Sequence, residues 1–552
     1  MSGPTVPEWL AQRALTLPDR PALIGGGRQW TFSQLHGAAD ALAGWLAGLG
    51  VEPGDRVATL LRNGPHTVQV IHALTRLGAV LTPLNTRLSA PELAWPIQDA
   101  TVRLLLHDEA TASLSSALRA QAPGLRQEAL TAQPPEASAH SIEPGQLDLD
   151  RPHSIIYTSG TTGRPKGVTL TYANHWWSAV GSALNLGAHE ADRWLAVLPL
   201  FHVGGQAIVL RGVIYGVPVV VHEGFDPAAV NRAIDQDSVT IVSVVAAMLR
   251  RMLDDRAGQP YPPTLRCVLL GGGPAPLPLL HECAQLGLPV VQTYGLTETA
   301  SQVVTLAPTD ALRKLGAAGK PLLSMDLRVE HEGRPAAPGQ AGEIMLRGPN
   351  VMAGYLNQPE ATAHALRGGW LHTGDLGYLD DQGYLYVLDR RDDLIISGGE
   401  NVYPAEVEGA LLAHPAVAEA IVVGLPHPRW GQAPAAAVTL RPGQSADAAA
   451  LIAHCAARLA RYKVPTVVRF RQALPRNAAG KPLRRVIREG WPDPQDNQSS
   501  GQGPNSQAAG VHEDGTATHY SETGPLAQEA LDRRDREDGP ATQYGQRGGH
   551  NE

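Results

Sequence analysis

The chain has 552 residues, of which 43% are hydrophobic and 18% are charged, a composition typical of a globular protein with about two to four domains. Its three cysteines show no C-x-x-C spacing, which excludes a disulfide scaffold or a cysteine zinc cluster and favours a reducing compartment. Almost all of the net charge of −8 lies in residues 492–552, which hold eleven acidic and four basic side chains, so the nearly neutral remainder excludes a long basic face for nucleic acid.

The N-terminal segment, from Met1 to Glu8, has neither a basic n-region nor an apolar h-region, so no secretion signal is predicted. The longest apolar run, from Thr240 to Met248, is far shorter than the ~18 residues that span a bilayer and predicts a buried strand instead. We therefore expect a cytoplasmic protein without stable membrane insertion. The sequence leaves a homo-oligomer open.

From about Val6 to Val387 the sequence alternates short apolar strands with amphipathic helices, which predicts a layered α/β domain. Near the start of this region, Arg56–Leu61 and Ala79–Leu84 are predicted as strands on either side of a helix over Thr67–Leu77. Residues 130–150 have the composition of a polar linker. The same strand pattern returns at Arg193–Leu198, Pro218–His222, Val239–Val244, Leu265–Leu270 and Pro289–Gln292.

The pattern changes at the charge cluster of residues 389–393, which lies between the predicted strands Tyr384–Leu388 and Leu394–Ser397. After it we expect helices over Pro404–Leu412 and Asp447–Leu459, and strands over Ala418–Gly424 and Ala435–Leu440. The sequence thus predicts a large α/β domain over 1–388, a hinge over 389–393 and a small α+β domain over 394–490. Residues 491–552 are predicted to be a disordered polar tail, because after Trp491 the chain lacks Ile, Phe, Met and Lys.

A glycine- and hydroxyl-rich loop, Thr158-Ser-Gly-Thr-Thr-Gly-Arg-Pro-Lys-Gly167, follows the apolar run Ser154–Tyr157. Glycines let successive backbone N–H groups converge on an anion, and Lys166 adds a positive charge. The spacing is not that of a P-loop, which requires G-x-x-x-x-G-K-[ST]. An ordinary surface turn is the alternative. We favour a site for a nucleoside triphosphate of a different kind.

This loop belongs to a set of motifs that occur in order along residues 1–490. With them the chain resembles the acyl-adenylate-forming superfamily of acyl- and aryl-CoA synthetases, adenylation domains and beetle luciferases. The other matching motifs are Leu200-Phe-His-Val-Gly204, Tyr294-Gly-Leu-Thr-Glu298, Gly342-Glu-Ile, Trp370-Leu-His-Thr-Gly-Asp375, Asp389-Arg-Arg-Asp-Asp-Leu-Ile, Gly398-Gly-Glu-Asn-Val-Tyr-Pro404 and Pro475-Arg-Asn-Ala-Ala-Gly-Lys481.

The resemblance implies a large N-terminal domain, a small mobile C-terminal domain and a reaction in two halves. A carboxylate attacks the α-phosphate of ATP, and coenzyme A then displaces AMP from the acyl-adenylate. Lys481 resembles the lysine that bridges the two anionic reactants, and Thr297 would donate its hydroxyl to the α-phosphate. Glu298 would hold Mg²⁺, a hard ion that prefers oxygen ligands and bridges to phosphates.

The resemblance also assigns residues to the parts of the nucleotide and of coenzyme A. Asp375 and Arg390 would bind the ribose, and Gly398 and Gly399 would line the channel for pantetheine. Asp392 would be the pivot of the domain movement, although Arg391 is an equal alternative. The remaining cofactor-binding candidates are Thr158, Ser159, Gly160, Thr161, Thr162, Gly163 and Lys166 for the phosphates, Gly271, Gly272 and Gly273 for adenine, and Tyr294 and Gly295 for the nucleotide.

Within the superfamily, four segments look most like the o-succinylbenzoate–CoA ligases of menaquinone biosynthesis. Their acid carries two carboxylates, of which one reacts and the other needs a cation. Arg211 is the candidate for that cation, unless it pairs with an acid of the protein itself. His202 and Ser301 are further candidates at the acid pocket. The four segments are Asn174–Gly187, Leu210–Gly216, Ser243–Val245 and Thr297–Gln302.

Other activities stay open at this point. A fatty- or aryl-acyl CoA ligase would gain nothing from Arg211, because its acid lacks a second carboxylate. A carrier-protein adenylation module would need a carrier domain, and none follows residue 490. A luciferase-like oxygenase has little support, and a non-catalytic nucleotide-binding scaffold would be expected to have lost Lys481 or Glu298, which are both present.

Overall fold

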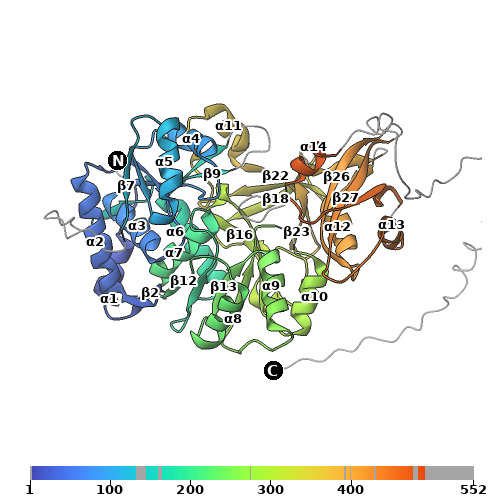
Figure 1. Ribbon diagram of the computed structural model, residues 1–552, viewed down its shortest axis with the longest axis horizontal. Coiled ribbons are helices and arrows are strands. Elements are labelled where there is room, and N and C mark those ends of the chain that lie inside the picture. Colours follow the sequence, from blue (N-terminus) through green and yellow to red (C-terminus); the bar gives the residue numbers. More distant parts are fainter. Residues whose placement is uncertain are drawn as a thin grey trace, which may run out of the picture. The chain divides into compact units, whose positions relative to one another are not determined.

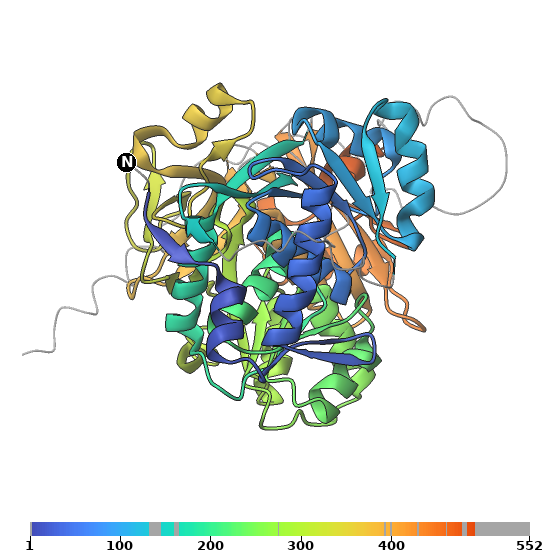
Figure 2. The same ribbon diagram turned by 90° about the vertical axis from the view of Figure 1, so that its left-hand side faces the viewer.

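A computed structural model describes residues 3–131, 145–158, 165–273, 275–390, 393–397, 400–427, 430–459, 461–476 and 483–491. Most of the chain before residue 390 is built around two large sheets, which Figures 1 and 2 show from two sides. In the described residues, no helix is long and apolar enough to cross a membrane.

The first large sheet has seven strands in the order β21-β10-β9-β5-β4-β6-β7. Its centre is parallel, and β10 adds antiparallel to β9 at one side. The strands are β4 (Arg56–Leu60), β5 (Val80–Pro83), β6 (Leu104–His107), β7 (Arg126–Ala129), β9 (Pro152–Thr158), β10 (Lys166–Thr171) and β21 (Gly354–Tyr355).

The second large sheet has nine strands in the order β17-β16-β15-β14-β13-β11-β12-β2-β3. Strands from β2 to β15 along this order run parallel, and β3, β16 and β17 add antiparallel at the two ends. The strands are β2 (Pro21–Gly25), β3 (Arg28–Thr31), β11 (Trp194–Ala196), β12 (Val219–Val221), β13 (Ile241–Val244), β14 (Cys267–Leu270), β15 (Val290–Leu296), β16 (Ser301–Thr305) and β17 (Lys320–Pro321).

The helices of the large domain separate these sheets and cover their outer faces. Side chains of α2 (Phe32–Gly48), α3 (Pro65–Leu77) and α7 (Val203–Tyr215) share one buried core with strands of both sheets. On the opposite face of the nine-stranded sheet pack α8 (Pro227–Gln236), α9 (Ala246–Arg256) and α10 (Leu277–Gln285). The remaining helices are α1 (Trp9–Thr16), α4 (Ala90–Asp99), α5 (Ala112–Gln121), α6 (Tyr172–Leu186) and α11 (Pro359–Ala365).

Local sequence signals explain where the helices begin and end. Helix α2 starts with a capping box in which Thr31 and Gln34 exchange side-chain-to-backbone hydrogen bonds. Helix α3 has Pro65 in its first turn, where the missing N–H costs nothing, and stops at Gly78, whose φ of 72° is left-handed. The predicted strand–helix–strand unit over Arg56–Leu84 is thereby confirmed.

The α/β alternation ends earlier than we predicted. Residues 301–390 form mainly antiparallel strands, including a five-stranded sheet in the order β19-β18-β20-β22-β23. We predicted that strands and helices alternate in this region, but it consists mainly of strands. A short, half-buried antiparallel strand shows only a weak alternation of polar and apolar residues, so the sequence pattern does not reveal it. The strands are β18 (Asp326–His331), β19 (Arg334–Pro335), β20 (Gly342–Arg347), β22 (Leu371–Leu379) and β23 (Leu385–Arg390).

Two smaller predictions were also wrong. The apolar run from Thr240 to Met248 is not one strand, because β13 ends at Val244 and helix α9 begins at Ala246. Within the predicted linker, Gln146–Asp148 forms strand β8, which pairs antiparallel with β1 (Thr5–Pro7). The predicted disordered tail from 492 onward lies outside the described residues.

The chain after residue 393 forms its own sheet and core, which Figure 1 shows in orange. The predicted helix over Pro404–Leu412 is confirmed as α12, and α13 covers Ala448–Ala456. Strands β26 and β27 pair antiparallel over ten residue pairs, and β28 adds parallel to β27. The strands are β24 (Ile395–Ser397), β25 (Glu400–Val402), β26 (Val417–His427), β27 (Gly431–Leu440) and β28 (Val467–Phe470).

The last described helix, α14 (Arg484–Glu489), is held to this sheet by a buried ion pair. The Nη2 of Arg484 donates to both carboxylate oxygens of Glu408, at 2.9 Å each, and Glu408 also accepts the backbone N–H of Val422. The backbone N–H of Leu483 donates to the carbonyl of Pro475, so the two flanks of residues 476–482 are fixed together.

Replacing Arg484 by Met should lower the free energy of unfolding of the small domain by about 3–5 kcal/mol, because the buried carboxylate of Glu408 would lose its ion pair with the guanidinium. Urea unfolding followed by circular dichroism measures this loss. The control is Arg485→Met: that side chain is 73% exposed and its ion pair with Glu489 lies at the surface, so its loss should change the free energy by less than about 0.5 kcal/mol. Equal effects of the two replacements would contradict the structural importance of the buried pair.

Candidate active site

The predicted phosphate loop connects two antiparallel strands rather than a strand and a helix. Thr158 ends β9 and Lys166 begins β10, and the two are register partners across the hairpin. The carbonyl of Pro165 accepts a hydrogen bond of 2.9 Å from the indole of Trp95, which fixes the end of the loop. The predicted phosphate-binding residues Ser159, Gly160, Thr161, Thr162 and Gly163 lie outside the described residues.

A tight turn between β15 and β16 carries five of the predicted residues. Tyr294 and Gly295 end β15, Thr297 and Glu298 lie in a single 3₁₀ turn over Thr297–Thr299, and Ser301 begins β16. A Cβ on residue 295 would lie 1.6 Å from the backbone oxygen of Ser301, so only glycine fits there. Ala300 and Ser301 have φ values of 50° and 86°, and such left-handed backbone is costly for non-glycine residues.

The predicted metal ligand Glu298 is joined to the phosphate loop through a tyrosine. The hydroxyl of Tyr355, on β21, donates to Glu298 Oε1 at 3.0 Å. The Nζ of Lys166 lies over the ring of the same tyrosine, 4.9 Å from its centroid. The ammonium group of Lys166 and the carboxylate of Glu298, which come from different sheets, thus both contact Tyr355.

The predicted ribose ligand Asp375 lies on β22 and is buried, with 6% of its surface exposed. It accepts a hydrogen bond of 2.7 Å from the hydroxyl of Tyr294, which links the five-stranded sheet to the turn after β15. Arg390 is the register partner of Asp375 across β22 and β23, so the backbones of the two predicted ribose residues are adjacent.

The predicted adenine loop follows β14, at the carboxyl end of a parallel strand. A Cβ on Gly271 would lie 3.0 Å from the side chain of Thr293, the neighbour of Tyr294 on β15. Gly272 has a φ of 82°, which a side chain would disfavour. Gly271 therefore brings bare backbone next to the strand that carries Tyr294, whereas a Cβ on Gly272 would meet Val245 and one on Gly273 would meet no described atom within 4 Å.

His202 is the N-cap residue of helix α7, and the Val-Gly-Gly segment that follows it forms the first turn of that helix. Asn63 holds the preceding loop with two hydrogen bonds of 2.8 Å, to the carbonyl of Leu198 and from the N–H of Leu200. Burial lowers the pKa of His202 to about 4, so its imidazole is neutral at physiological pH. Its Nε2 is buried without a hydrogen-bond partner among the described residues.

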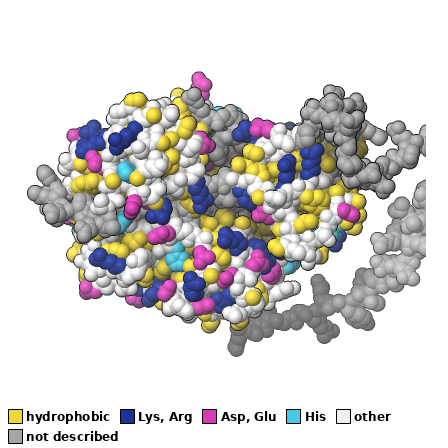
Figure 3. Space-filling view, in the orientation of Figure 1, with side chains coloured by type: hydrophobic (Ala, Val, Ile, Leu, Met, Phe, Trp, Pro, Cys, Tyr) yellow, Lys and Arg dark blue, Asp and Glu magenta, His cyan; other side chains and the backbone are white. Residues whose placement is uncertain are grey.

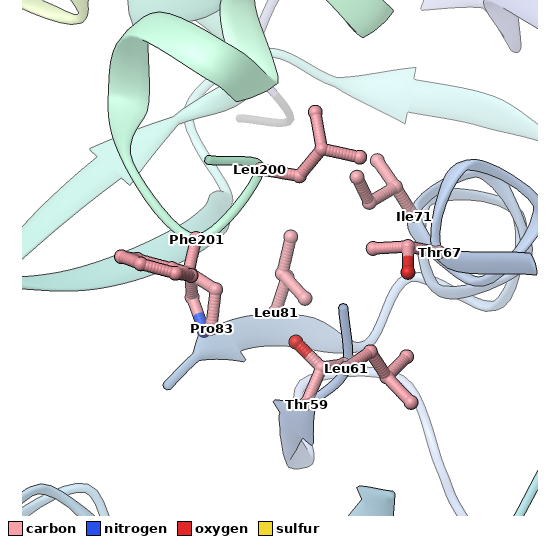
Figure 4. Close-up of a pocket in the computed structure, with 8 residues that line it drawn as sticks. All are labelled: Thr59, Leu61, Thr67, Ile71, Leu81, Pro83, Leu200 and Phe201. Carbon is pink, nitrogen blue, oxygen red and sulfur yellow. The ribbon is translucent and has the colours of Figure 1, made fainter. Parts of the chain in front are cut away.

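A small cavity lies behind this loop, between Leu200, Phe201 and the ends of β4 and β5 (Figure 4). Its volume is about 10 Å³, which is room for one water molecule. It is lined mainly by aliphatic side chains, with the hydroxyl groups of Thr59 and Thr67 among them. The cavity is therefore too small to hold a carboxylic acid.

Arg211 lies on helix α7 and is almost fully buried, with 2% of its surface exposed. Its Nη1 donates to Oε1 of Gln302 at 2.5 Å, and its Nη2 donates to the hydroxyl of Ser178 at 3.0 Å. The guanidinium also lies over Trp194, 5.7 Å from the ring centroid. Within the described residues it forms no ion pair with a carboxylate. The predicted alternative, a structural acid as its partner, therefore finds no support.

The structure connects Arg211 directly to the turn after β15. The hydroxyl of Ser178, which accepts from Arg211, donates to the carbonyl of Ala300 at 2.7 Å. Gln302, the other partner, follows Ser301 on β16. Arg211 thus lies immediately behind the segment that carries Glu298 and Ser301.

Several predicted residues cannot be placed. Lys481, Asp392, Gly398 and Gly399 lie outside the described residues, as does the alternative pivot Arg391. For Arg390 only the backbone is described.

Two family models match the chain. The description of the first is AMP-binding enzyme, and it matches residues 10–356. The chain belongs to the AMP-binding enzyme family. The second model, the AMP-binding enzyme C-terminal domain, matches residues 406–481. The adenylate-forming fold, with its large N-terminal and small C-terminal domains, is therefore confirmed.

This AMP-binding enzyme has close relatives of known activity and structure. It is 54% identical over 484 residues to a 2-succinylbenzoate–CoA ligase of Geobacillus kaustophilus, covering 88% of this chain and 98% of the relative. It is 45% identical to the o-succinylbenzoate CoA synthetase MenE of Bacillus subtilis in complex with the acyl-adenylate intermediate OSB-AMP, with a TM-score of 0.81, covering 88% and 98% of the two chains. For the same synthetase in complex with ATP and magnesium ion, the identity is 45%, the TM-score is 0.82, and the coverage is 87% and 99%.

Three residues that contact predicted site residues were not predicted from the sequence: Tyr355 binds Glu298, and Ser178 and Gln302 bind Arg211. Tyr355 lies on a two-residue strand that no periodicity could reveal. Ser178 and Gln302 fall inside segments that we compared with o-succinylbenzoate–CoA ligases, but their roles depend on contacts between α6, α7 and β16. A buried arginine needs hydrogen-bond acceptors, so a search for polar side chains in these segments could have found Ser178 and Gln302.

A cluster of three buried histidines lies next to this region. His72, His153 and His175 are 2%, 2% and 3% exposed, and the rings of His153 and His175 are 4.6 Å apart. Burial lowers the pKa of His72 to about 4 and that of His175 to about 3, and it lowers the pKa of His153 well below its usual value. All three imidazoles are therefore neutral in the folded protein.

The cluster predicts that the protein loses stability in mild acid. Below about pH 6.5 each of these histidines binds a proton in the unfolded chain but not in the folded one, so the free energy of unfolding falls as the pH falls. For His72 alone the loss between about pH 7 and about pH 5 is about 2 kcal/mol. Urea unfolding of His72→Gln should show a pH dependence that is smaller by this amount. An unchanged pH dependence would contradict the prediction.

Proposed function

We propose that this protein is an AMP-forming 2-succinylbenzoate–CoA ligase of menaquinone biosynthesis. It activates the acid with ATP to give an acyl-adenylate and pyrophosphate, and coenzyme A then takes the acyl group and releases AMP. The observation that carries this assignment is the similarity to 2-succinylbenzoate–CoA ligases over nearly their whole length. A cytoplasmic location remains a prediction, as does the absence of bound nucleic acid.

The described residues fit the nucleotide and Mg²⁺. No group of three or more His, Cys, Asp or Glu side chains in the described part of the chain could hold a metal alone. Glu298 offers a single hard oxygen ligand close to Lys166, and Mg²⁺ is usually bound by one or two carboxylates together with substrate phosphates and water. In our proposal the metal offsets the phosphate charge, Asp375 accepts hydrogen bonds from the ribose, and Thr297 donates to the α-phosphate.

The first half-reaction brings a carboxylate onto a phosphate, and both are anions. We propose that Lys481 supplies the bridging positive charge and that the small domain, residues 394–490, moves about the hinge at 389–393 to deliver it. His202 presents a neutral ring to the acid, and its unpartnered Nε2 can bind an oxygen there. Once the adenylate has formed, a rotation of the small domain to a second orientation would move Lys481 away and bring Gly398 and Gly399 to line the pantetheine channel.

Arg211 supports the choice of a dicarboxylic acid. Burying a guanidinium without a counter-ion costs several kcal/mol, and its hydrogen bonds to neutral groups return only part of that cost. A pocket for a monocarboxylic acid would have no use for such a group. We propose that the second carboxylate of the substrate is its partner.

The assignment is tested by ATP–pyrophosphate exchange with a panel of acids. We expect exchange with 2-succinylbenzoate, weaker exchange with 4-phenyl-4-oxobutanoate, which lacks the ring carboxylate, and none above background with a long-chain fatty acid. Formation of the CoA thioester, followed by chromatography, checks the second half-reaction. Exchange with the fatty acid but not with 2-succinylbenzoate would overturn the assignment.

Replacing Arg211 by Ala should lower kcat/KM for 2-succinylbenzoate by about 10- to 150-fold, the range expected when a hydrogen bond to a charged group is lost. The loss should appear mainly as a higher KM, because the charge recognises the acid rather than the reacting atoms. With 4-phenyl-4-oxobutanoate the same variant should stay close to the wild type. Equal losses for both acids would remove the proposed role of Arg211.

A further inference from the structure

Among the described residues, the side chains that contact the Arg211 guanidinium are all uncharged. Gln302 and Ser178 accept its hydrogen bonds, and Trp194 offers the face of its ring. Tyr215 and His175 interact electrostatically with it; burial keeps the first a neutral phenol and the second a neutral imidazole. The positive charge is therefore not compensated by the described part of the protein.

The amide of Gln302 is held by the groups around it. Its Oε1 accepts from Arg211 and from the hydroxyl of Ser182 at 2.8 Å, and its Nε2 lies 3.2 Å from the hydroxyl of Thr305. Gln302 is 1% exposed, so water does not compete for these contacts. This side chain is the closest polar neighbour of the Arg211 charge.

A glutamate would fit the same place. Its carboxylate could accept from Arg211 and Ser182 as the amide oxygen does, and the hydroxyl of Thr305 could turn to donate to its second oxygen. A buried arginine paired with a carboxylate is the common arrangement in proteins. The chain instead has the isosteric neutral side chain, which leaves the charge of Arg211 available.

We propose that Gln302 is a specificity-determining residue: as a neutral partner it orients Arg211 without neutralising it, so that the charge selects an acid with a second carboxylate. This inference rests on the proposed function, since it concerns the same acid pocket. In a buried site a charge acts strongly on a nearby carboxylate, whereas an internal ion pair would cancel that attraction. Gln302 acts through Arg211 and is therefore a positioning residue.

The test is Gln302→Glu, which changes the charge at this position but hardly the shape. We expect kcat/KM for 2-succinylbenzoate to fall by roughly 100-fold, as expected when like charges are brought together in a buried site. For 4-phenyl-4-oxobutanoate it should change by less than about 3-fold, so the preference for the dicarboxylate is lost. The melting temperature should stay the same or rise, because Arg211 gains a counter-ion; a merely structural role for Gln302 would predict a fall.

Two further variants separate charge from shape. Gln302→Met removes the hydrogen bonds that orient Arg211 but stays neutral, so it should weaken the preference for the dicarboxylate much less than Gln302→Glu does, and this variant decides the matter if Gln302→Glu does not fold. Gln292→Glu makes the same amide-to-acid change on β15, where the amide donates to the carbonyl of Ala317 instead. It should leave the ratio between the two acids unchanged.

The outcomes also separate this inference from the proposed function. If the wild type prefers the dicarboxylate and Gln302→Glu keeps that preference, the role of Gln302 is refuted while the proposed function stands. A loss of the preference in Gln302→Met as large as that in Gln302→Glu would refute it as well, because the neutrality of residue 302 would then make no difference. If the wild type shows no preference for the dicarboxylate, the proposed function fails and the inference fails with it.

Discussion

The active site depends on one steric constraint, the contact between Gly295 and the backbone oxygen of Ser301. Because no side chain separates them, β15 can turn back into β16 within a few residues and place Tyr294, Glu298 and Ser301 on one short segment. The hydroxyl of Tyr294 then reaches Asp375 in the five-stranded sheet, and Glu298 reaches Tyr355 in the seven-stranded sheet. Three sheets meet at this turn, and each contributes one of the polar groups proposed to bind the nucleotide.

Opposite charges accompany one another on the surface and at one buried arginine, but not at Arg211. On the face drawn in Figure 3, Lys and Arg side chains are interspersed with Asp and Glu side chains. Inside, Arg484 has Glu408 as its partner. Arg211 has no carboxylate partner among the described residues. A protein tolerates such an exception when a ligand completes the site, and stability in the absence of the ligand is lower as a result.

Much of the fold could be predicted from the sequence, because its strongest signals are local. Apolar runs correctly predicted the parallel strands β4, β5, β11, β12, β13 and β14, and Pro404 marked the start of α12, whereas β6 and β7 were not predicted. The antiparallel strands after Ser301 were missed because pairing between distant segments determines them. For the site, the predicted residues Tyr294, Gly295, Thr297, Glu298 and Ser301 fall on the turn between β15 and β16, and their roles stay predictions. Tyr355 and Gln302 could not be predicted, since their importance arises only when helices and sheets pack.

The hydrogen bond between Leu483 and Pro475 has a mechanical consequence. It joins Pro475 to Leu483, and Arg484 in the following helix is bound to Glu408 of the small domain. The described residues on both sides of 477–482 therefore belong to one compact unit with the sheet formed by β26 and β27. An exchange of residues 394–490 between related ligases would keep these contacts within the exchanged part, so such hybrids should retain the core of the small domain.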